Sequence, residues 1–156
     1  MKGAKILRHE PRQPRATTMN DMNVVIEPVD PVGETARRLI GALWDEVGAR
    51  YGAAPSPFSA AEAAESRTVF LAATIDGEPV ACGSLRRLDD ATAEVRRMYV
   101  SPQVRRHGIA RRMLLELERR AKEFGYGVIR LETGVRQPEA QRLYESMGFH
   151  PIAAFG

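Results

Sequence analysis

The chain has 156 residues, a length typical of one domain and sufficient to bury a core without disulfides or metals. Apolar residues make up 44% and charged residues 28%, which excludes a wholly disordered chain, a collagen-like chain and a disulfide scaffold. No stretch approaches the roughly 18 apolar residues that a membrane span requires. The single cysteine, Cys82, and three scattered histidines form no metal-binding pattern, so we expect no metal.

The excess positive charge lies at the N-terminus. Residues 1–22 hold five basic and two acidic side chains, and this excess of three equals the whole net charge of +3. The rest of the chain is therefore neutral, and we expect no nucleic-acid partner. The arm also lacks the apolar core and cleavage site of a secretory signal. We predict a disordered basic arm over residues 1–21 and one domain over residues 22–156.

The first part of that domain is predicted to contain a strand, a helix and an irregular segment. A run of branched residues predicts a strand over residues 23–28. Asp30 followed by Pro31 is typical of a helix N-terminus, and apolar residues recur at helical spacing from there to about Tyr51. Residues 52–65 are rich in Ala, Pro and Ser and are predicted to form a loop or a short helix.

Three strands separated by short turns follow. They are predicted over residues 69–75, 79–88 and 93–100. An Asp-Gly pair at 76–77 is a hairpin signal, and an Asp-Asp pair at 89–90 marks the second turn. Such close spacing favours an antiparallel meander. Cys82 falls inside the second strand between small residues, where we expect it to be a buried filler.

The apolar pattern then changes from the period of a strand to that of a helix. We predict a helix over 109–124, a strand over 128–133, a helix over 138–148 and a last strand over 149–155. A strand–helix–strand unit over 93–133 joins two parallel strands. The fold class is therefore α/β (α+β), with a mixed, mostly antiparallel sheet flanked by helices.

The most informative segment joins the third meander strand to the long helix. Over residues 99–110 a strand ends at a proline, a basic loop follows, and a helix begins at Gly108. A helix N-terminus offers unpaired N–H groups and a partial positive charge, and glycine permits close backbone approach. The surrounding arginines are Arg105, Arg106, Arg111 and Arg112. This arrangement predicts a pyrophosphate site; the alternative is an ordinary arginine-rich helix start.

Residues 105–110, Arg-Arg-His-Gly-Ile-Ala, match the Arg/Gln-x-x-Gly-x-Gly/Ala signature of the GNAT superfamily of N-acetyltransferases. The chain resembles that family on both sides of the motif. Residues 94–100 are similar to its splayed fourth strand, and residues 140–149 are similar to its second hallmark segment. The resemblance covers about residues 67–156.

The resemblance implies that strands 93–100 and 128–133 splay apart and hydrogen-bond the pantetheine arm of acetyl-CoA, the acyl donor. The pyrophosphate would lie on the loop at 105–111. A bulge in the first of these strands would aim a backbone N–H at the acetyl carbonyl. The residues expected to bind the donor are Met98, Tyr99, Val100, Arg105, Arg106, His107, Gly108, Ile109, Ala110, Arg111 and Gln137.

The resemblance also implies two catalytic side chains, Glu94 and Tyr144. Glu94 lies eleven residues before Arg105, a spacing similar to that of the family's glutamate base, and would act through a water. The alternative is an ion-pair partner of Arg96. Tyr144 would protonate or hydrogen-bond the departing thiolate; the alternative is a packing role. Since a phenol of pKa ~10 is a weaker acid than a thiol of pKa ~8.5, hydrogen bonding is the larger part of that role.

We therefore expect a cytoplasmic, acetyl-CoA-dependent N-acetyltransferase in which a primary amine attacks the acetyl group directly. The acceptor is a small-molecule or peptide amine that the sequence does not identify, and the length of the acyl group and a homodimer are left open. We expect no membrane partner. The competing hypothesis is a non-catalytic acyl-CoA-binding or interaction module on the same fold.

Overall fold

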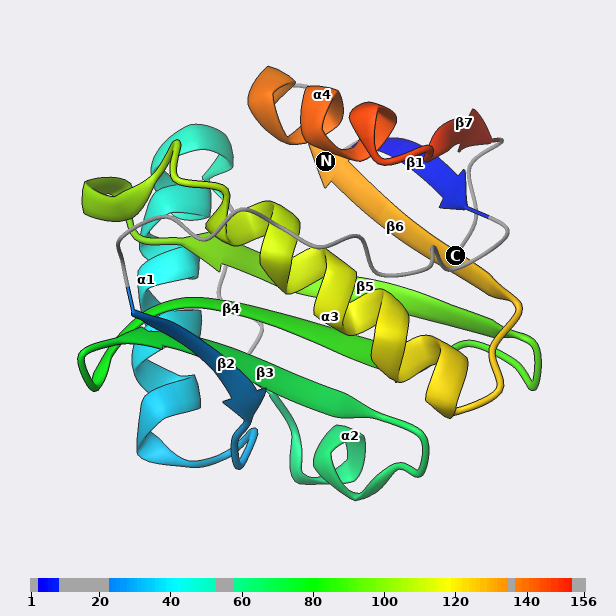
Figure 1. The fold of residues 1–156 in the computed structure, drawn as a ribbon, viewed down its shortest axis with the longest axis horizontal. Coiled ribbons are helices and arrows are strands. Elements are labelled where there is room, and N and C mark those ends of the chain that lie inside the picture. The colour runs from blue at the N-terminus through cyan, green and yellow to red at the C-terminus, as the bar shows by residue number, and fades with distance from the viewer. Residues whose placement is uncertain (1–2, 9–22, 53–57, 135–136, 153–156) are drawn as a thin grey trace.

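The computed structural model describes residues 3–8, 23–52, 58–134 and 137–152, whose strands form one sheet with helices on both faces (Figure 1). The strands are β1 Gly3–Arg8, β2 Val24–Pro28, β3 Val69–Ile75, β4 Glu78–Arg87, β5 Thr92–Val100, β6 Val128–Gly134 and β7 His150–Ile152. The helices are α1 Glu34–Tyr51, α2 Ala60–Ala64, α3 Ile109–Glu123 and α4 Pro138–Ser146, with a short 3₁₀ turn, η1, over Pro102–Val104. The strand order across the sheet is β2-β3-β4-β5-β6-β1-β7.

The antiparallel meander is confirmed. Strands β2, β3, β4 and β5 each pair antiparallel with the next. Asp76 and Gly77 form the β3–β4 turn with φ angles of 50° and 84°, the left-handed conformation that a type I′ hairpin turn requires at both positions.

The parallel pair is confirmed, and it is short. Strand β6 pairs with β5 from Thr92 to Val95, opposite residues Val128 to Leu131. Strand β5 nevertheless continues to Val100 and β6 to Gly134. The last five residues of β5 therefore have no register partner on β6, and the two strands part at this point.

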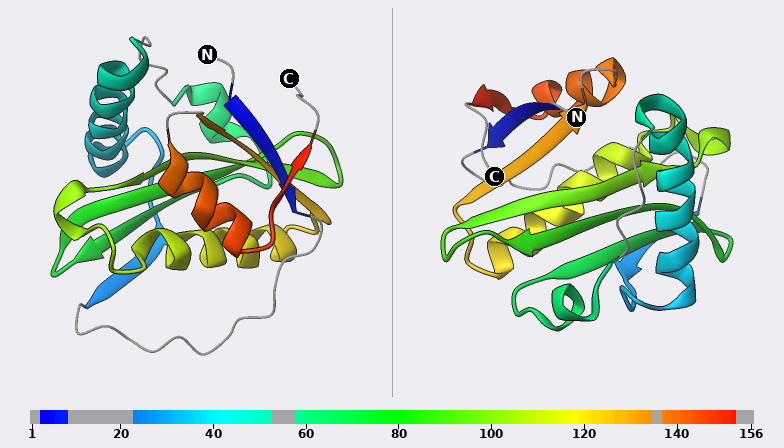
Figure 2. Two further views of the ribbon diagram at one scale, coloured as in Figure 1. Left: turned by 90° about the horizontal axis from the view of Figure 1, so that it is seen from above. Right: turned by 180° about the vertical axis from the view of Figure 1, so that it is seen from behind.

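Helices α3 and α1 lie on opposite faces of the sheet (Figure 2), and each covers a separate apolar core. Helix α3 covers one face with the predicted stripe, in which Met113, Leu114 and Leu117 are fully buried. Helix α1 covers the other face through Leu39 and Ile40. None of the helices in the described ranges has both the length and the apolar character needed to cross a bilayer.

Residues 3–8 correct the prediction of a disordered arm. They form β1, which lies between β6 and β7 and pairs antiparallel with both. The first pair joins Gly3 to Gly134, 131 residues further along the chain, so no local pattern could indicate it. Residues 9–22, the rest of the predicted arm, lie outside the described residues.

Two predicted boundaries also change. Helix α1 begins at Glu34 after Gly33, because Asp30 caps a turn instead: its Oδ1 accepts from the Val32 amide at 3.0 Å, and its carbonyl accepts from the Gly33 amide at 3.0 Å. The predicted last strand is described only as β7, and its remaining residues 153–156 lie outside the described ranges.

Candidate active site

A β-bulge lies in β5 where that strand separates from β6. Ser84 of β4 is opposite Arg96, whereas Cys82 is opposite Tyr99, so two steps along β4 match three steps along β5. The extra residue gives Arg97 a φ of 55°, in the left-handed region. This conformation costs roughly 1–2 kcal/mol for a residue with a side chain, so other contacts must hold it.

Two side chains of β4 donate hydrogen bonds to the backbone of the bulge. The Ser84 hydroxyl donates to the carbonyl of Arg96 at 3.1 Å, and the Cys82 thiol donates to the carbonyl of Arg97 at 3.2 Å. Burial raises the pKa of the Cys82 thiol to about 12, although the charge of Arg97 opposes this. Cys82 is thus buried as predicted and stays protonated, which excludes a nucleophilic thiolate at neutral pH.

Gly83 lies between these two residues and faces side chains of β5 and α3 at close range. A Cβ atom added there would lie 2.7 Å from Met98 Sδ and 3.0 Å from a methyl carbon of Leu117. The absence of a side chain lets Met98, which follows the bulge, pack against α3.

The loop between β5 and α3 has an unusual backbone. The amide of Ser101 donates to the carbonyl of Val80 at 2.7 Å, and η1 then turns the chain toward α3. Arg106 and Gly108 both have left-handed φ angles, 68° and 78°. Gly108 is the N-cap of α3 and gives no side-chain cap, so the first-turn amides have no cap from that residue. A Cβ atom on Gly108 would meet nothing within 4 Å.

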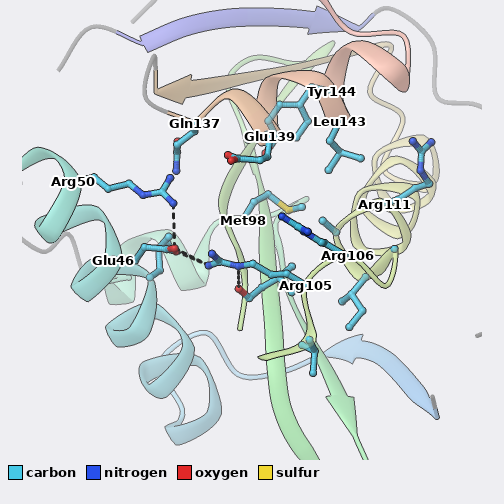
Figure 3. Close-up of a pocket in the computed structure, with 17 residues that line it drawn as sticks. Glu46, Arg50, Met98, Arg105, Arg106, Arg111, Gln137, Glu139, Leu143 and Tyr144 are labelled. Atoms are coloured by element: carbon cyan, nitrogen blue, oxygen red, sulfur yellow. Dashed lines mark hydrogen bonds and ion pairs between the residues drawn. The ribbon is translucent and has the colours of Figure 1, made fainter. Parts of the chain in front are cut away.

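These features surround a cavity of about 510 Å³ (Figure 3). Its walls come from α1, β5, the loop before α3, and α4. The predicted residues that line it are Met98, Val100, Arg105, Arg106, Gly108, Ile109, Ala110, Arg111, Gln137 and Tyr144. The predicted residues outside its lining are Glu94, Tyr99 and His107. Tyr99 packs against the core on the α1 face, and His107 is exposed.

Arg105 is held by the protein itself. Its Nη2 lies 2.8 Å from both carboxylate oxygens of Glu46, and its Nε donates to the Val100 carbonyl at 2.9 Å (Figure 3). Glu46 lies 3.6 Å from Arg50 on the same helix. Arg105 therefore ties the loop to α1. Glu46 and Arg50 line the cavity but are not among the residues predicted to bind the donor, because the ion pair between Glu46 and Arg105, 59 residues apart, leaves no local pattern.

Arg106 and Arg111 contribute positive charge to the cavity near the start of α3. Arg111 Nη2 also donates to the hydroxyl of Ser146 at 2.8 Å, which links α3 to α4. With the first-turn amides of α3, these groups provide what an anionic phosphate needs: directed donors, a helix dipole and cations.

Tyr144 lies on the α4 side of the cavity (Figure 3). Its ring is 6% exposed and packs edge-on against Phe149, with the ring centroids 5.9 Å apart. Burial raises the pKa of the Tyr144 hydroxyl to about 12. The phenol is therefore a donor that stays protonated throughout the ordinary pH range.

Glu94 lies on β5 before the strands part, opposite Arg86 on β4 and Arg130 on β6. Its Oε1 is 3.2 Å from Nε of Arg86 and 3.4 Å from Nε of Arg96, and its side chain is 12% exposed. The ion pair with Arg96, the alternative raised from the sequence, is thus present. Glu94 does not line the cavity.

The comparisons with known proteins agree with this geometry. The sequence profile of the Acetyltransferase (GNAT) family matches residues 37–149. A protein from Azospirillum brasilense named IAA acetyltransferase is 32% identical over 136 residues, which cover 86% of this chain and 89% of that protein. The chain therefore belongs to the GNAT acetyltransferase family.

Solved structures share the fold. A GCN5-related N-acetyltransferase from Ralstonia eutropha JMP134 superposes with a TM-score of 0.67 at 20% identity, covering 86% of this chain and 97% of that one. A GNAT family acetyltransferase from Elizabethkingia anophelis, solved with acetyl-CoA bound, gives a TM-score of 0.65 at 20% identity, covering 86% and 80%. The expected fold class is therefore confirmed.

Proposed function

We propose that this acetyltransferase moves an acetyl group from acetyl-CoA to a primary amine, and that the amine attacks the thioester directly. The observation that carries the proposal is that Met98 and Val100, which follow the bulge in the part of β5 that has left β6, line the same cavity as the uncapped start of α3. The groups suited to bind the phosphates and the amides suited to bind the oxyanion therefore belong to a single extended substrate site.

The cavity residues suit coenzyme A as the carrier of the acetyl group. The Gly108 α-carbon faces open space, so a phosphate can approach the amides that follow it. Arg106 and Arg111 would neutralise the pyrophosphate. The unpaired edge of β5, from residue 96 to 100, would accept the pantetheine amides as an added strand does.

The reaction needs a donor for the developing oxyanion. The amine nitrogen forms a bond to the carbonyl carbon, and the carbonyl electron pair moves to oxygen. A backbone N–H among Met98, Tyr99 and Val100, beside the bulge, would stabilise that oxygen. When the carbonyl re-forms, the carbon–sulfur bond breaks and the sulfur leaves as a thiolate.

The thiolate would accept a hydrogen bond from Tyr144. A phenol with a pKa near 12 is a much weaker acid than a thiol of pKa ~8.5, so complete proton transfer from Tyr144 is unfavourable. A hydrogen bond to the departing sulfur requires no such transfer, and the thiolate then takes its proton from solvent.

The amine must lose a proton. A lysine-like amine of pKa ~10.4 is neutral in only about one molecule in 2,500 at pH 7, whereas about one α-amino group in ten is neutral. We propose that a water carries this proton toward Glu94, because the carboxylate is held by Arg86 and Arg96 outside the cavity.

An amine panel tests the proposal. The full-length chain is incubated with acetyl-CoA and α-amino acids, peptides, polyamines or aminoglycosides, and release of the free thiol is followed together with the mass of the acceptor. We expect thiol release to depend on one class of amine. If coenzyme A binds but no amine is acetylated, the chain is a non-catalytic acyl-CoA-binding module and the proposal is wrong.

A further inference from the structure

Helix α2 contacts the bulge of β5 through one carboxylate. Glu62 Oε2 accepts from the amide of Ser59 at 3.0 Å, and the Ser59 hydroxyl accepts from the amide of Glu62 at 3.0 Å, so the two residues close a capping box. The other oxygen, Oε1, accepts from Arg96 Nη1 at 3.0 Å and from Arg97 Nη2 at 3.4 Å. Glu62 thus caps the start of α2 and forms ion pairs with both arginines of the bulge.

Arg97 is held on a second side by an aromatic ring. Its side chain is only 4% exposed, and its guanidinium lies over the ring of Phe58 at 4.6 Å from the centroid. Phe58 in turn packs edge-on against Phe70 of β3, with the centroids 5.8 Å apart. The guanidinium is therefore held between Glu62 and Phe58, a pair that we call the clamp. Contacts with neighbouring residues fix both members of this pair.

This clamp acts on the residue whose backbone is strained. Arg97 has the left-handed φ of 55°, and such a conformation persists in a residue with a side chain only when surrounding contacts hold it. Without the clamp, the extra residue of a bulge could relax or move along the strand. Either change would redirect the amides that follow Arg97.

We propose that Glu62 and Arg97 are positioning residues: they hold the bulge so that its following amide points at the thioester carbonyl. This inference rests on the proposed function, because it assigns a structural basis to the oxyanion donor. Neither side chain lines the cavity. Both act through the backbone, and a displacement of about 1 Å at a reacting group can cost roughly 100-fold in rate.

The chain contains a matched control for Arg97. Arg67 also has a left-handed φ, 57°, and its guanidinium also lies over an aromatic ring, that of Tyr126, at 4.0 Å. It donates to the carbonyls of Phe124 and Asp90, both at 2.9 Å, and it does not line the cavity. Arg67→Ala therefore removes a comparable set of contacts at another place in the fold.

The experiment measures the carbonyl stretch of bound acetyl-CoA, labelled with ¹³C at the thioester carbon, by infrared difference spectroscopy. In the wild type, a hydrogen bond from the bulge amide lowers this frequency relative to free acetyl-CoA. We expect Arg97→Ala to lose most of that shift and to reduce kcat by about 10–100-fold. The Kd of coenzyme A, which has no acetyl carbonyl, should change by less than about threefold.

Two further variants complete the test. In Glu62→Gln the side-chain amide oxygen can still accept from the Ser59 amide, so this change disturbs the fold less than Arg97→Ala does. It should lose part of the shift in carbonyl frequency, and it tests the inference even if Arg97→Ala does not fold. Arg67→Ala should reduce stability while the carbonyl frequency and kcat stay as in the wild type. The inference is wrong if Arg97→Ala and Glu62→Gln both keep the wild-type frequency and kcat.

The wild type separates this inference from the function on which it rests. If the wild-type protein binds acetyl-CoA without any lowering of the carbonyl frequency, the proposed oxyanion donor is wrong and the inference falls with it. If the wild type shows the shift and the variants retain it, only the positioning role is overturned.

Discussion

Gly108 is the residue on which the proposed phosphate site depends most directly. We expect Gly108→Asp to weaken coenzyme A binding at least about 100-fold, because its carboxylate would occupy the open space before α3 and repel the pyrophosphate. Isothermal titration calorimetry measures the change. Gly108→Asn keeps the size without the charge and should lose less affinity.

The control for this change is Gly77→Asp. Gly77 also has a left-handed φ, 84°, and a Cβ atom there would also meet nothing within 4 Å, but it lies in the β3–β4 turn. It should leave the affinity unchanged. Equal affinity in the Gly108 and Gly77 variants would contradict the phosphate assignment.

Tyr144 is expected to affect turnover more than binding. Tyr144→Phe keeps the ring contact with Phe149 and removes only the hydroxyl, so kcat should fall about 10–100-fold while the Kd of acetyl-CoA changes little. Steady-state kinetics and calorimetry separate the two. Tyr126→Phe is the control, since the Tyr126 hydroxyl donates to the Arg67 carbonyl at 2.8 Å outside the cavity. If both variants keep the wild-type kcat, Tyr144 has only a packing role.

Glu94 is expected to show its role in the pH dependence of the rate. If a water carries the amine proton to Glu94, then Glu94→Gln lowers kcat and flattens the pH–rate profile below about neutral pH. Glu78→Gln, which removes the surface ion pair with Arg38 at 3.9 Å, should leave the profile unchanged. An unaltered profile in Glu94→Gln would leave Glu94 as the ion-pair partner of Arg86 and Arg96 alone.

At the scale of elements, the join between α2 and β5 should depend on pH. Burial alone would raise the pKa of Glu62, but the hydrogen bond from the Ser59 amide and the charges of Arg97 and Arg96 outweigh it and hold the pKa below its ordinary value of 4.5. The folded state favours the ionised carboxylate of Glu62. The contribution of Glu62 to stability is therefore present above about pH 4.5 and is lost as the pH falls through its folded-state pKa.

Urea unfolding at two pH values tests this expectation. Glu62→Gln cannot ionise, so its deficit in unfolding free energy relative to the wild type should be full at pH 7 and should shrink below about pH 4.5. A deficit of the same size at pH 7 and at pH 3.5 would show that the charge of Glu62 contributes nothing.

The elements also show what the sequence could predict. Contiguous patterns predicted β3 at its observed bounds, the apolar stripe of α3 and the glycine at its start, because periodicity and turn chemistry act over a few residues. The capping box of α2 was also readable, as a serine three residues before Glu62, but we predicted only a loop or short helix there.

Contacts between distant elements could not be predicted. Glu46 reaches Arg105 because α1 packs on the sheet, and Glu62 reaches Arg97 because α2 lies on the same face of the sheet as α1 (Figure 2). Charged residues of this kind have no spacing rule that distinguishes them from a solvated surface. The sequence could not predict that Glu94 lies outside the cavity either, because its position depends on which face of β5 meets which helix.

At the scale of the whole molecule, coenzyme A should stabilise the fold. The cavity takes residues from α1, β5, α3 and α4, so it exists only when these elements are assembled. At a ligand concentration 100 times the Kd, the gain is about 2.7 kcal/mol, or roughly 5–10 °C in Tm for a domain of this size. Differential scanning fluorimetry measures it. Gly108→Asp should show almost no shift, and an equal shift in both proteins would place the ligand elsewhere.

The position of β1 has a consequence for how the protein matures. Gly3 is translated before its partner Gly134, which follows 131 residues later, an interval on the order of ten seconds. Throughout that interval β1 has neither neighbour, and afterwards it must enter between two strands that are translated after it (Figure 1). The sheet beside the parted strands is therefore completed only once β6 and β7 have been translated, and by a strand made before either of them.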